Sequence, residues 1–230
     1  MGVQIPQPPP KHLYGILYPF RGKTTLYHFF VIRFSSSKYY QDFSLRMSIV
    51  IVVSSPREGG FGRRIAEKVA EGINQAGKKA KIVLLNDLGP VKQCQNCEAC
   101  KKNGCHCVIK DGITPLLEEI RESEGIVHVT SINFNHVSGL FKTYFDRYFC
   151  FLDENSSSTF PTGKKVATIV TAGADDTAAE KEAAEYQKIM AQHFLCEPVG
   201  TLTYTSWFLP AGEFADDSVL DRAFELGSKF

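Results

Sequence analysis

Short apolar runs and amphipathic segments alternate strictly between residues 48 and 204, and this alternation limits the possible folds more than any other feature. The runs are rich in Ile and Val, as strands buried on both faces are. Strands are predicted at residues 48–53, 81–85, 126–130, 166–171 and 199–204, and helices at about 63–77, 113–120, 138–149 and 177–193. Strands separated by crossover helices pair in parallel with right-handed connections. We therefore expect an α/β fold with three layers, built on a doubly wound five-stranded parallel sheet.

The first 46 residues differ from the rest in composition, with six basic residues, one acid (Asp42) and ten Phe or Tyr. We place a domain boundary at Met47, between an atypical extension (1–46) that is disordered or not native and a domain of residues 47–230. Three interpretations of the extension compete: a start site placed upstream of a true initiator at Met47, an arm that packs on a partner, and an acid-poor transit peptide.

Composition and cysteine usage limit the classes of function. The chain has 230 residues, is 43% hydrophobic and carries a formal net charge of +1, so we expect one main core and no binding to nucleic acid or membranes. No apolar run is long enough to span a bilayer. Five of the seven cysteines crowd into residues 94–107, which indicates metal chemistry in a reducing compartment rather than disulfides. The expected location is the cytoplasm.

The loop after the first strand, residues 54–63, has the composition of a phosphate-binding turn. Its glycines allow close backbone approach, and the helix that follows offers its positive end to an anion. Ser55 adds a hydroxyl and Arg57 a permanent charge. The loop lacks the Lys of an ATPase P-loop and the glycine spacing of a Rossmann fingerprint. The alternative is an ordinary Gly-rich turn.

Three cysteines in C-x2-C-x2-C spacing (Cys94, Cys97 and Cys100) indicate an iron-sulfur cluster, because bacterial ferredoxin-type clusters use this triple spacing. The fourth ligand comes from Cys105 or Cys107. Zinc and a bare redox-active thiol group remain alternatives, although zinc sites usually pair two separated knuckles. The two remaining cysteines, Cys150 and Cys196, are expected in the core.

With both motifs placed, the chain from Met47 to about Phe208 resembles the iron-sulfur flavoproteins within the NADPH-dependent FMN reductase-like group. The resemblance rests on four stretches in the same order: residues 55–60 (SPREGG), 94–104 (CQNCEACKKNG), 107–111 (CVIKD) and 140–147 (LFKTYFDR). It implies a flavodoxin-like fold, FMN as prosthetic group, and a [4Fe-4S] cluster on the cysteine segment, about residues 93–108. It also implies homodimers or homotetramers in which a cluster lies near a neighbouring subunit's flavin.

The resemblance also assigns the FMN contacts. The phosphate would rest on the loop after the first strand, and the ring would lie against the loops after the third and fourth strands. The residues so assigned are Ser55, Arg57, Gly59, Gly60, Phe61, Gly62, Thr130, Ser131, Ile132, Asn133, Phe134, Thr171 and Gly173. The chain departs from the family at Phe61 and Gly62, where Asn and then Thr or Ser are usual, and at residues 130–133, where the family has Thr-Pro-x-Tyr. Alignment favours Cys107 as fourth ligand, whereas the shortest spacing favours Cys105.

We therefore expect a redox flavoprotein that carries electrons between FMN, the cluster and an external partner, which is a redox protein or NAD(P)H. No dedicated acid-base residue is required. One alternative is an NAD(P)H-dependent FMN or quinone reductase without a cluster, and another is a zinc-stabilised binding module. Asp146 and Arg147 are expected to form an ion pair or a subunit contact, and Trp207 and Phe208 to cover a flavin or fill an interface.

Overall fold

The computed structural model describes residues 48–55, 57–174, 176–210, 213–214 and 217–230. The expectations for the extension at residues 1–46 and for an initiator at Met47 lie outside the described residues, as does Pro56 in the predicted phosphate loop.

The core of the structure is a parallel sheet with the strand order β2-β1-β3-β5-β6. These strands are β1 (Ser48–Val53), β2 (Lys79–Leu84), β3 (Gly125–Asn133), β5 (Lys165–Ala172) and β6 (Glu197–Thr205). Counted along the chain, this is the 2-1-3-4-5 order of flavodoxin-like sheets. The predicted α/β class and its five parallel strands are confirmed.

A sixth strand corrects the expected strand count. The two-residue strand β4 (His136–Val137) pairs antiparallel with the end of β3, where Ile132 faces Val137. Strand β3 consequently extends to Asn133, three residues beyond the predicted end, because its last residues gain a pairing partner after leaving the parallel sheet. The turn between these two strands holds Phe134 and Asn135, both with positive φ.

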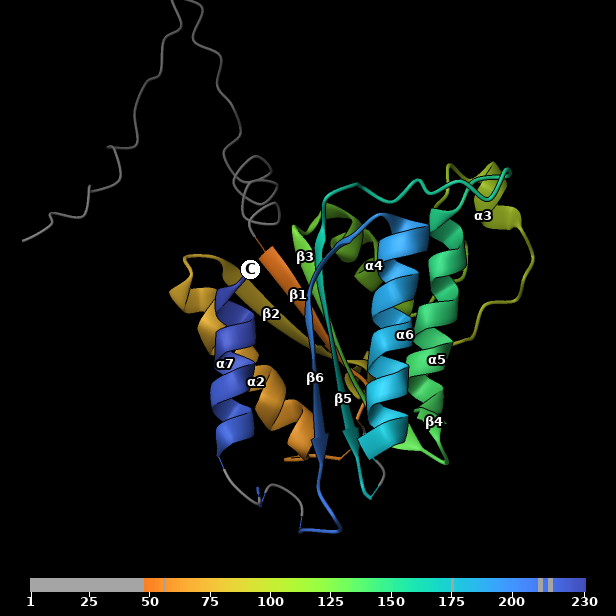
Figure 1. The fold of residues 1–230 in the computed structure, drawn as a ribbon. Coiled ribbons are helices and arrows are strands. Elements are labelled where there is room, and N and C mark those ends of the chain that lie inside the picture. Colours follow the sequence, from red (N-terminus) through yellow and green to blue (C-terminus); the bar gives the residue numbers. More distant parts are fainter. Residues whose placement is uncertain (1–47, 56, 175, 211–212, 215–216) are drawn as a thin grey trace, which may run out of the picture.

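Helices cover both faces of the sheet (Figure 1). One face carries α2 (Phe61–Gln75) and α7 (Ser218–Ser228), and the other carries α4 (Ile113–Glu122), α5 (Gly139–Asp146) and α6 (Asp176–Phe194). Alternate residues of β1 point into the two layers. Ile49 and Ile51 pack with the α2 and α7 layer, whereas Val50 and Val52 pack with the opposite layer. The three-layer prediction is confirmed, and α7 adds a helix that was not predicted.

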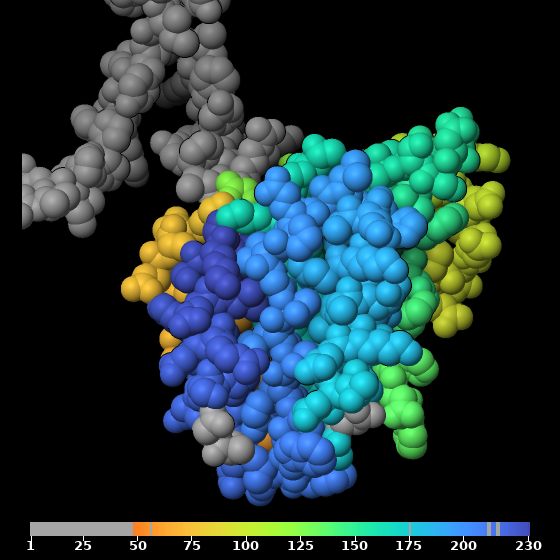
Figure 2. All heavy atoms as spheres, viewed as in Figure 1, coloured from red at the N-terminus to blue at the C-terminus, as the bar shows by residue number. Residues whose placement is uncertain are grey.

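The cysteine segment forms a long connection between β2 and α4. It contains the 3-10 turn η1 (Leu85–Leu88) and the short helix α3 (Ala99–Lys102). The segment packs against the 3-10 turn η2 (Arg147–Phe151), which continues α5. Figure 1 shows α3 toward the upper end of the molecule, whereas the arrows of β5 and β6 end at the lower one, and Figure 2 shows the same segment on the outer flank of the molecule.

Candidate functional site

A cleft of about 260 Å³ opens at the carboxyl ends of β1, β3 and β5. This position follows from the strand order, because β2 lies on one side of β1 and β3 on the other, so the connections diverge there and leave a crevice. The cleft is lined by Ser55, Arg57, Gly60, Phe61, Gly62, Ser131, Ile132, Asn133, Thr171, Ala172, Gly173 and Ser206. The structure therefore brings ten of the thirteen predicted FMN contacts to one cavity.

The phosphate loop meets the start of α2 without a side-chain cap. Gly60 is the N-cap residue of α2, so no side chain caps this end of the helix. The first turn also contains no acidic residue. The first amides of a helix have no intrahelical partner, and the helix dipole makes this end positive. The N-terminus of α2 is therefore open to an anion.

Two glycines at this end of α2, Gly60 and Gly62, line the cleft. A Cβ at Gly60 would lie 3.1 Å from the Arg57 carbonyl oxygen and 3.5 Å from Ser55 Oγ, and a Cβ at Gly62 would lie 3.4 Å from Val129 Cγ1. Glycine therefore lets the loop pack closely on its neighbours, and no side chain at these two positions separates the backbone from the cleft. The loop fits a phosphate in this respect, although Phe61 offers it only an aromatic ring and a backbone amide.

A buried hydroxyl cluster fixes the loop from behind. Ser54 Oγ donates to Thr130 Oγ1 at 2.9 Å, and Ser138 Oγ donates to Ser54 Oγ at 3.1 Å. Ser138 also caps α5 by accepting a hydrogen bond from the amide of Phe141. The cluster joins the ends of β1 and β3 to the start of α5, so the cleft floor is held by three elements.

Three of the predicted contacts do not line the cleft. Thr130 is buried beneath it in the hydroxyl cluster, and Gly59 is exposed in the phosphate loop with a φ of 66°. Phe134 is fully exposed at the turn between β3 and β4. These residues were assigned from the family resemblance. For Phe134 the difference arises because β3 runs to Asn133 rather than ending at Thr130, which carries Phe134 beyond the cleft.

Ser206 lines the cleft but was not predicted, because it follows the last predicted strand. Its amide donates to the Ala172 carbonyl at 2.9 Å, and the Phe208 amide donates to the Gly173 carbonyl at 3.1 Å. These bonds hold the segment after β6 against the loop after β5. Trp207 and Phe208, both with positive φ, remain 62% and 81% exposed at this side of the cleft.

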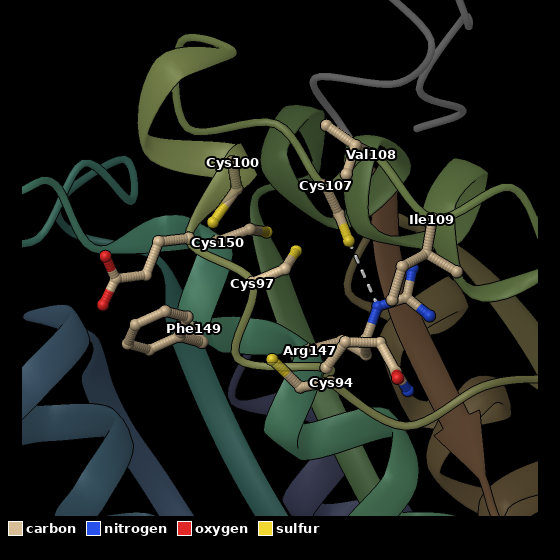
Figure 3. A pocket seen from close by; sticks show the side chains of 11 residues that line it. Cys94, Cys97, Cys100, Cys107, Val108, Ile109, Arg147, Phe149 and Cys150 are labelled. Carbon is tan, nitrogen blue, oxygen red and sulfur yellow. Dashed lines mark hydrogen bonds between the residues drawn. The ribbon is translucent and has the colours of Figure 1, made fainter.

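A second, smaller cavity of about 20 Å³ is lined by five cysteines. Cys94, Cys97, Cys100 and Cys107 come from the predicted segment, and Cys150 comes from η2. Figure 3 shows these side chains turned toward the same cavity, with Arg147 and Phe149 beside them. Cys150 is buried, as expected of a core thiol, but it also faces the predicted cluster.

Cys105 does not line this cavity. Its backbone is left-handed, with a φ of 63°, and its sulfur lies 3.7 Å from the Leu152 carbonyl oxygen. Cys107 lies on the cavity and accepts a hydrogen bond from Arg147 Nε at 3.2 Å. Of the two candidates for the fourth ligand, the structure brings Cys107 to the other three cysteines.

Three basic residues hold the cysteine segment. Arg147 donates to the Lys92 carbonyl oxygen at 2.9 Å, and Lys101 donates to the Phe149 carbonyl oxygen at 2.7 Å. Arg121 donates to the Cys105 carbonyl oxygen at 2.7 Å. A cluster ligated by four thiolates is negatively charged, so the basic surroundings suit it.

Burial and charge shift the pKa values around the cysteine cavity. Burial raises the pKa of Cys150 to about 12, and the nearby Cys107 adds to this shift. Burial alone would also raise the pKa of Asp111, but hydrogen bonds from Arg147 and from the Lys92 amide, with the guanidinium charge, hold that pKa below its ordinary value. Asp111 is therefore ionised and paired with Arg147. Arg147 forms the expected ion pair, but with Asp111 rather than with Asp146, which pairs with Lys142.

The donor set fits an iron-sulfur centre in chemistry, because the three cysteines of the C-x2-C-x2-C segment and Cys107 face one cavity. Among the described residues, no three Cys, His, Asp or Glu side chains are arranged to hold a single metal ion. This placement of the side chains supports neither a zinc ion nor a bound cluster. The empty space between the thiols is about 20 Å³, which has room for about one water molecule.

Comparison with known proteins identifies similar sequences and folds. Residues 47–205 match the family model described as NADPH-dependent FMN reductase. A protein of Archaeoglobus fulgidus named iron-sulfur flavoprotein is 36% identical over 83 residues, which cover 36% of this chain and 40% of that protein. A second protein of that name from the same organism is 24% identical over 184 residues, with 80% and 78% covered.

An iron-sulfur flavoprotein of Methanocaldococcus jannaschii is 27% identical over 101 residues, which cover 44% of this chain and 51% of that protein. The matched part of the chain thus covers only 40% and 51% of the length of two of these three relatives. Two solved structures show the same fold. An NAD(P)H:quinone oxidoreductase from Methanothermobacter marburgensis has a TM-score of 0.55 at 15% identity, with 80% and 96% covered. An azoreductase from Bacillus anthracis has a TM-score of 0.58 at 17% identity, with 80% and 100% covered.

Every helix in the described part of the chain is too short or too polar to cross a membrane.

Proposed function

Because residues 47–205 match its family model, the chain belongs to the NADPH-dependent FMN reductase family, and we propose that it is an oxidoreductase that binds FMN in the cleft and an iron-sulfur cluster on the cysteine segment. The observation that carries this proposal is the uncapped N-terminus of α2, whose glycines Gly60 and Gly62 line the cleft beside Arg57. The relatives named iron-sulfur flavoprotein support it.

The residues of the cleft bind and orient. The amides at the start of α2 and the guanidinium of Arg57 would neutralise the phosphate, while β3 would supply Ser131 and Asn133, and β5 Thr171, to the flavin side. FMN, when bound, accepts a hydride or single electrons. Arg57 is the one charged side chain among the described residues that line the cleft. This suits electron transfer, which requires no acid-base residue.

The residues of the second cavity hold an iron-sulfur cluster. Cys94, Cys97, Cys100 and Cys107 are the proposed ligands, and the cluster, when bound, exchanges one electron at a time. Cys105 instead has a structural role, since its thiol faces Leu152 and its carbonyl accepts a bond from Arg121.

The strands β5 and β6 end at the lower end of the molecule, whereas α3 of the cysteine segment lies toward the upper one (Figure 1). The cleft opens where the parallel strands end, whereas the cysteine cavity lies on the outer side of η2. This separation favours a homodimer or homotetramer in which the cluster of one subunit approaches the flavin of another. NAD(P)H or a redox protein is the external electron partner.

A second candidate is an NAD(P)H-dependent FMN or quinone reductase whose cysteines hold no cluster. The small volume of the cysteine cavity favours it. Oxidation of NADPH that is unchanged when Cys97 is replaced by Ser would support this candidate.

The test is to purify the full-length chain without oxygen and measure its visible spectrum, flavin, iron and acid-labile sulfide. We expect FMN and about four irons and four sulfides per chain. Two matched variants assign the fourth ligand: Cys107→Ser is expected to lose iron, and Cys105→Ser to retain it with FMN unchanged in both. A colourless protein contradicts the flavin assignment. A yellow protein without iron leaves the second candidate in its place.

A further inference from the structure

Arg147 is a fully buried arginine beside the cysteine cavity, and the proposed electron transfer does not account for it. Its side chain has no solvent exposure and makes four hydrogen bonds. Nε donates to Cys107 Sγ at 3.2 Å, and the terminal nitrogens donate to the Lys92 carbonyl, to Asp111 Oδ2 at 2.8 Å and to Thr114 Oγ1 at 2.7 Å. A buried charge is retained only where its partners compensate for lost hydration.

The ion pair with Asp111 does not fully neutralise the positive charge of Arg147. Asp111 also accepts hydrogen bonds from the amides of Lys92, Ile113 and Thr114, at 2.8, 3.1 and 3.3 Å. Its negative charge is therefore shared with the backbone. Arg147 directs Nε at sulfur instead, and this N–H is the one that faces the proposed ligand set.

The other two basic residues act on the backbone. Lys101 Nζ contacts the carbonyls of Phe149 and Leu152, and Arg121 contacts the carbonyl of Cys105. Both hold the cysteine segment in place, but neither donates to a sulfur of the cavity in the described contacts. Arg147 thus combines full burial with direct contact to a cysteine sulfur.

Such a contact affects the two redox states of a bound cluster unequally. When the centre accepts one electron from the reduced flavin, its net charge becomes more negative by one, and Arg147 keeps its proton throughout. A fixed positive charge and an N–H donor stabilise the more negative state more strongly, and hydrogen bonds to sulfur raise the potential of iron-sulfur centres. Burial strengthens the effect because little water screens the guanidinium.

We propose that Arg147 is a positioning residue that sets the reduction potential of the iron-sulfur centre through its hydrogen bond and charge at Cys107. This rests on the proposed cluster and adds to it the group that tunes it. It predicts that the charge at position 147 controls the potential, and that the ion pair with Asp111 serves only to keep that charge buried.

The test uses the full-length protein reconstituted with iron and sulfide without oxygen. The midpoint potential is measured by a redox titration followed by electron paramagnetic resonance, with iron and FMN measured on the same samples. Arg147→Gln removes the charge and Arg147→Lys retains it. The double variant Arg147→Gln with Asp111→Asn removes the charge without leaving a buried carboxylate unpaired. Arg121→Gln is the matched control, since it removes a cation that holds the same segment.

We expect the midpoint potential to become more negative in Arg147→Gln. The shift should be smaller in the double variant, because removal of the Asp111 carboxylate offsets part of the lost positive charge, and iron and FMN should stay at their wild-type levels there. Arg147→Lys and Arg121→Gln should stay near the wild-type potential. Loss of iron from both Gln variants, with retention in Arg147→Lys, would show that the charge holds the cluster in place and would overturn a role in setting its potential.

A merely structural role predicts otherwise, because the potential would then follow thermal stability rather than charge, and Arg147→Lys and Arg147→Gln would shift it together. Such a common shift, an unchanged potential in Arg147→Gln, or an equal shift in Arg121→Gln overturns the proposal. A wild-type protein that takes up no iron refutes the proposed cluster and this inference together, whereas a wild-type cluster whose potential ignores residue 147 refutes only the inference.

Discussion

Stability at mildly acidic pH should depend on one buried histidine. His128 lies in β3, is completely buried, and is surrounded by the rings of Phe141, Tyr144, Phe145 and Tyr148 at centroid distances of 5.6 to 5.9 Å. Its Nε2 lies 3.2 Å from the Tyr148 hydroxyl, and its Nδ1 has no partner. No carboxylate in these contacts favours the charged ring, so burial lowers the pKa of His128 to about 3.

The sign and size of the effect follow from this pKa. Below pH 6.5 the histidine binds a proton in the unfolded state but stays neutral in the folded state. The free energy of unfolding is therefore at its full value above pH 6.5 and falls as the pH drops toward 3. Each pH unit in this window removes about 1.4 kcal/mol. At pH 5, about 1.5 units below the unfolded pKa, His128 should cost about 2 kcal/mol relative to pH 7.

The variant His128→Gln isolates this contribution, because Gln can still reach the Tyr148 hydroxyl but does not titrate. Urea unfolding followed by far-ultraviolet circular dichroism, at pH 7 and pH 5 with saturating FMN, gives the free energy of unfolding for both proteins. The wild type should lose about 2 kcal/mol more than the variant. Carboxylates such as Asp111 titrate in both proteins and cancel in the difference. Equal losses in the two proteins would refute the buried neutral state of His128.

Two further substitutions test the helix packing and the phosphate loop. Gly72→Ala should lower the free energy of unfolding by about 3 kcal/mol, because its Cβ would lie 2.1 Å from the Phe224 carbonyl oxygen of α7 and force the helices apart. The control is Gly139→Ala, which has open space around it and should leave the free energy of unfolding in urea unchanged or slightly higher. Equal effects of the two substitutions would contradict this packing. Arg57→Gln should weaken FMN binding about 10- to 100-fold in a flavin fluorescence titration, because a charge-assisted hydrogen bond is lost. The control is Arg64→Gln, since the guanidinium of Arg64 lies over the Phe214 ring. An unchanged affinity in Arg57→Gln would remove Arg57 from the site.

The parallel strands could be predicted from the sequence because each of them is a buried apolar run. Strand β1 occupies the predicted residues 48–53, and every one of its side chains is buried. The end of β3 could not be predicted in this way. Ser131 does not continue the apolar run but stays paired with Thr171 of β5, and Ile132 and Asn133 are in a strand only because β4 turns back to pair with them.

Helix α7 did leave a signal in the sequence. Val219, Ala223 and Leu226 recur at helical spacing and are all buried. Their packing partner could not be predicted, because it depends on two glycines, Gly72 of α2 and Gly227 of α7, that let the helix backbones approach closely. Close packing of this kind is a property of two distant segments together.

The same limit applies to the candidate sites. The phosphate loop and its glycines are contiguous in the sequence, so they could be assigned before the structure was known. The surroundings of the cysteines could not, because Arg147 and Cys150 lie about 40 residues beyond Cys107 and reach it only through the fold. Asp146 and Arg147 were expected to form an ion pair or a subunit contact, and nothing in the sequence indicated that the arginine is buried and paired with Asp111.

The length of the cysteine connection explains why basic residues gather around it. Connections in α/β folds usually contain about two to six residues, whereas the one between β2 and α4 runs from residue 85 to 112. Most of this connection has no helix or strand to satisfy its carbonyl groups, and water cannot reach those that pack on η2. Arg147 and Arg121 satisfy the carbonyls of Lys92 and Cys105 in the connection, and Lys101 of the connection in turn donates to the Phe149 carbonyl of η2. The cations that hold the long connection are therefore the same ones that surround the cysteines with positive charge. If the proposed cluster binds there, folding of this segment and binding of the anionic cluster would depend on a common set of side chains.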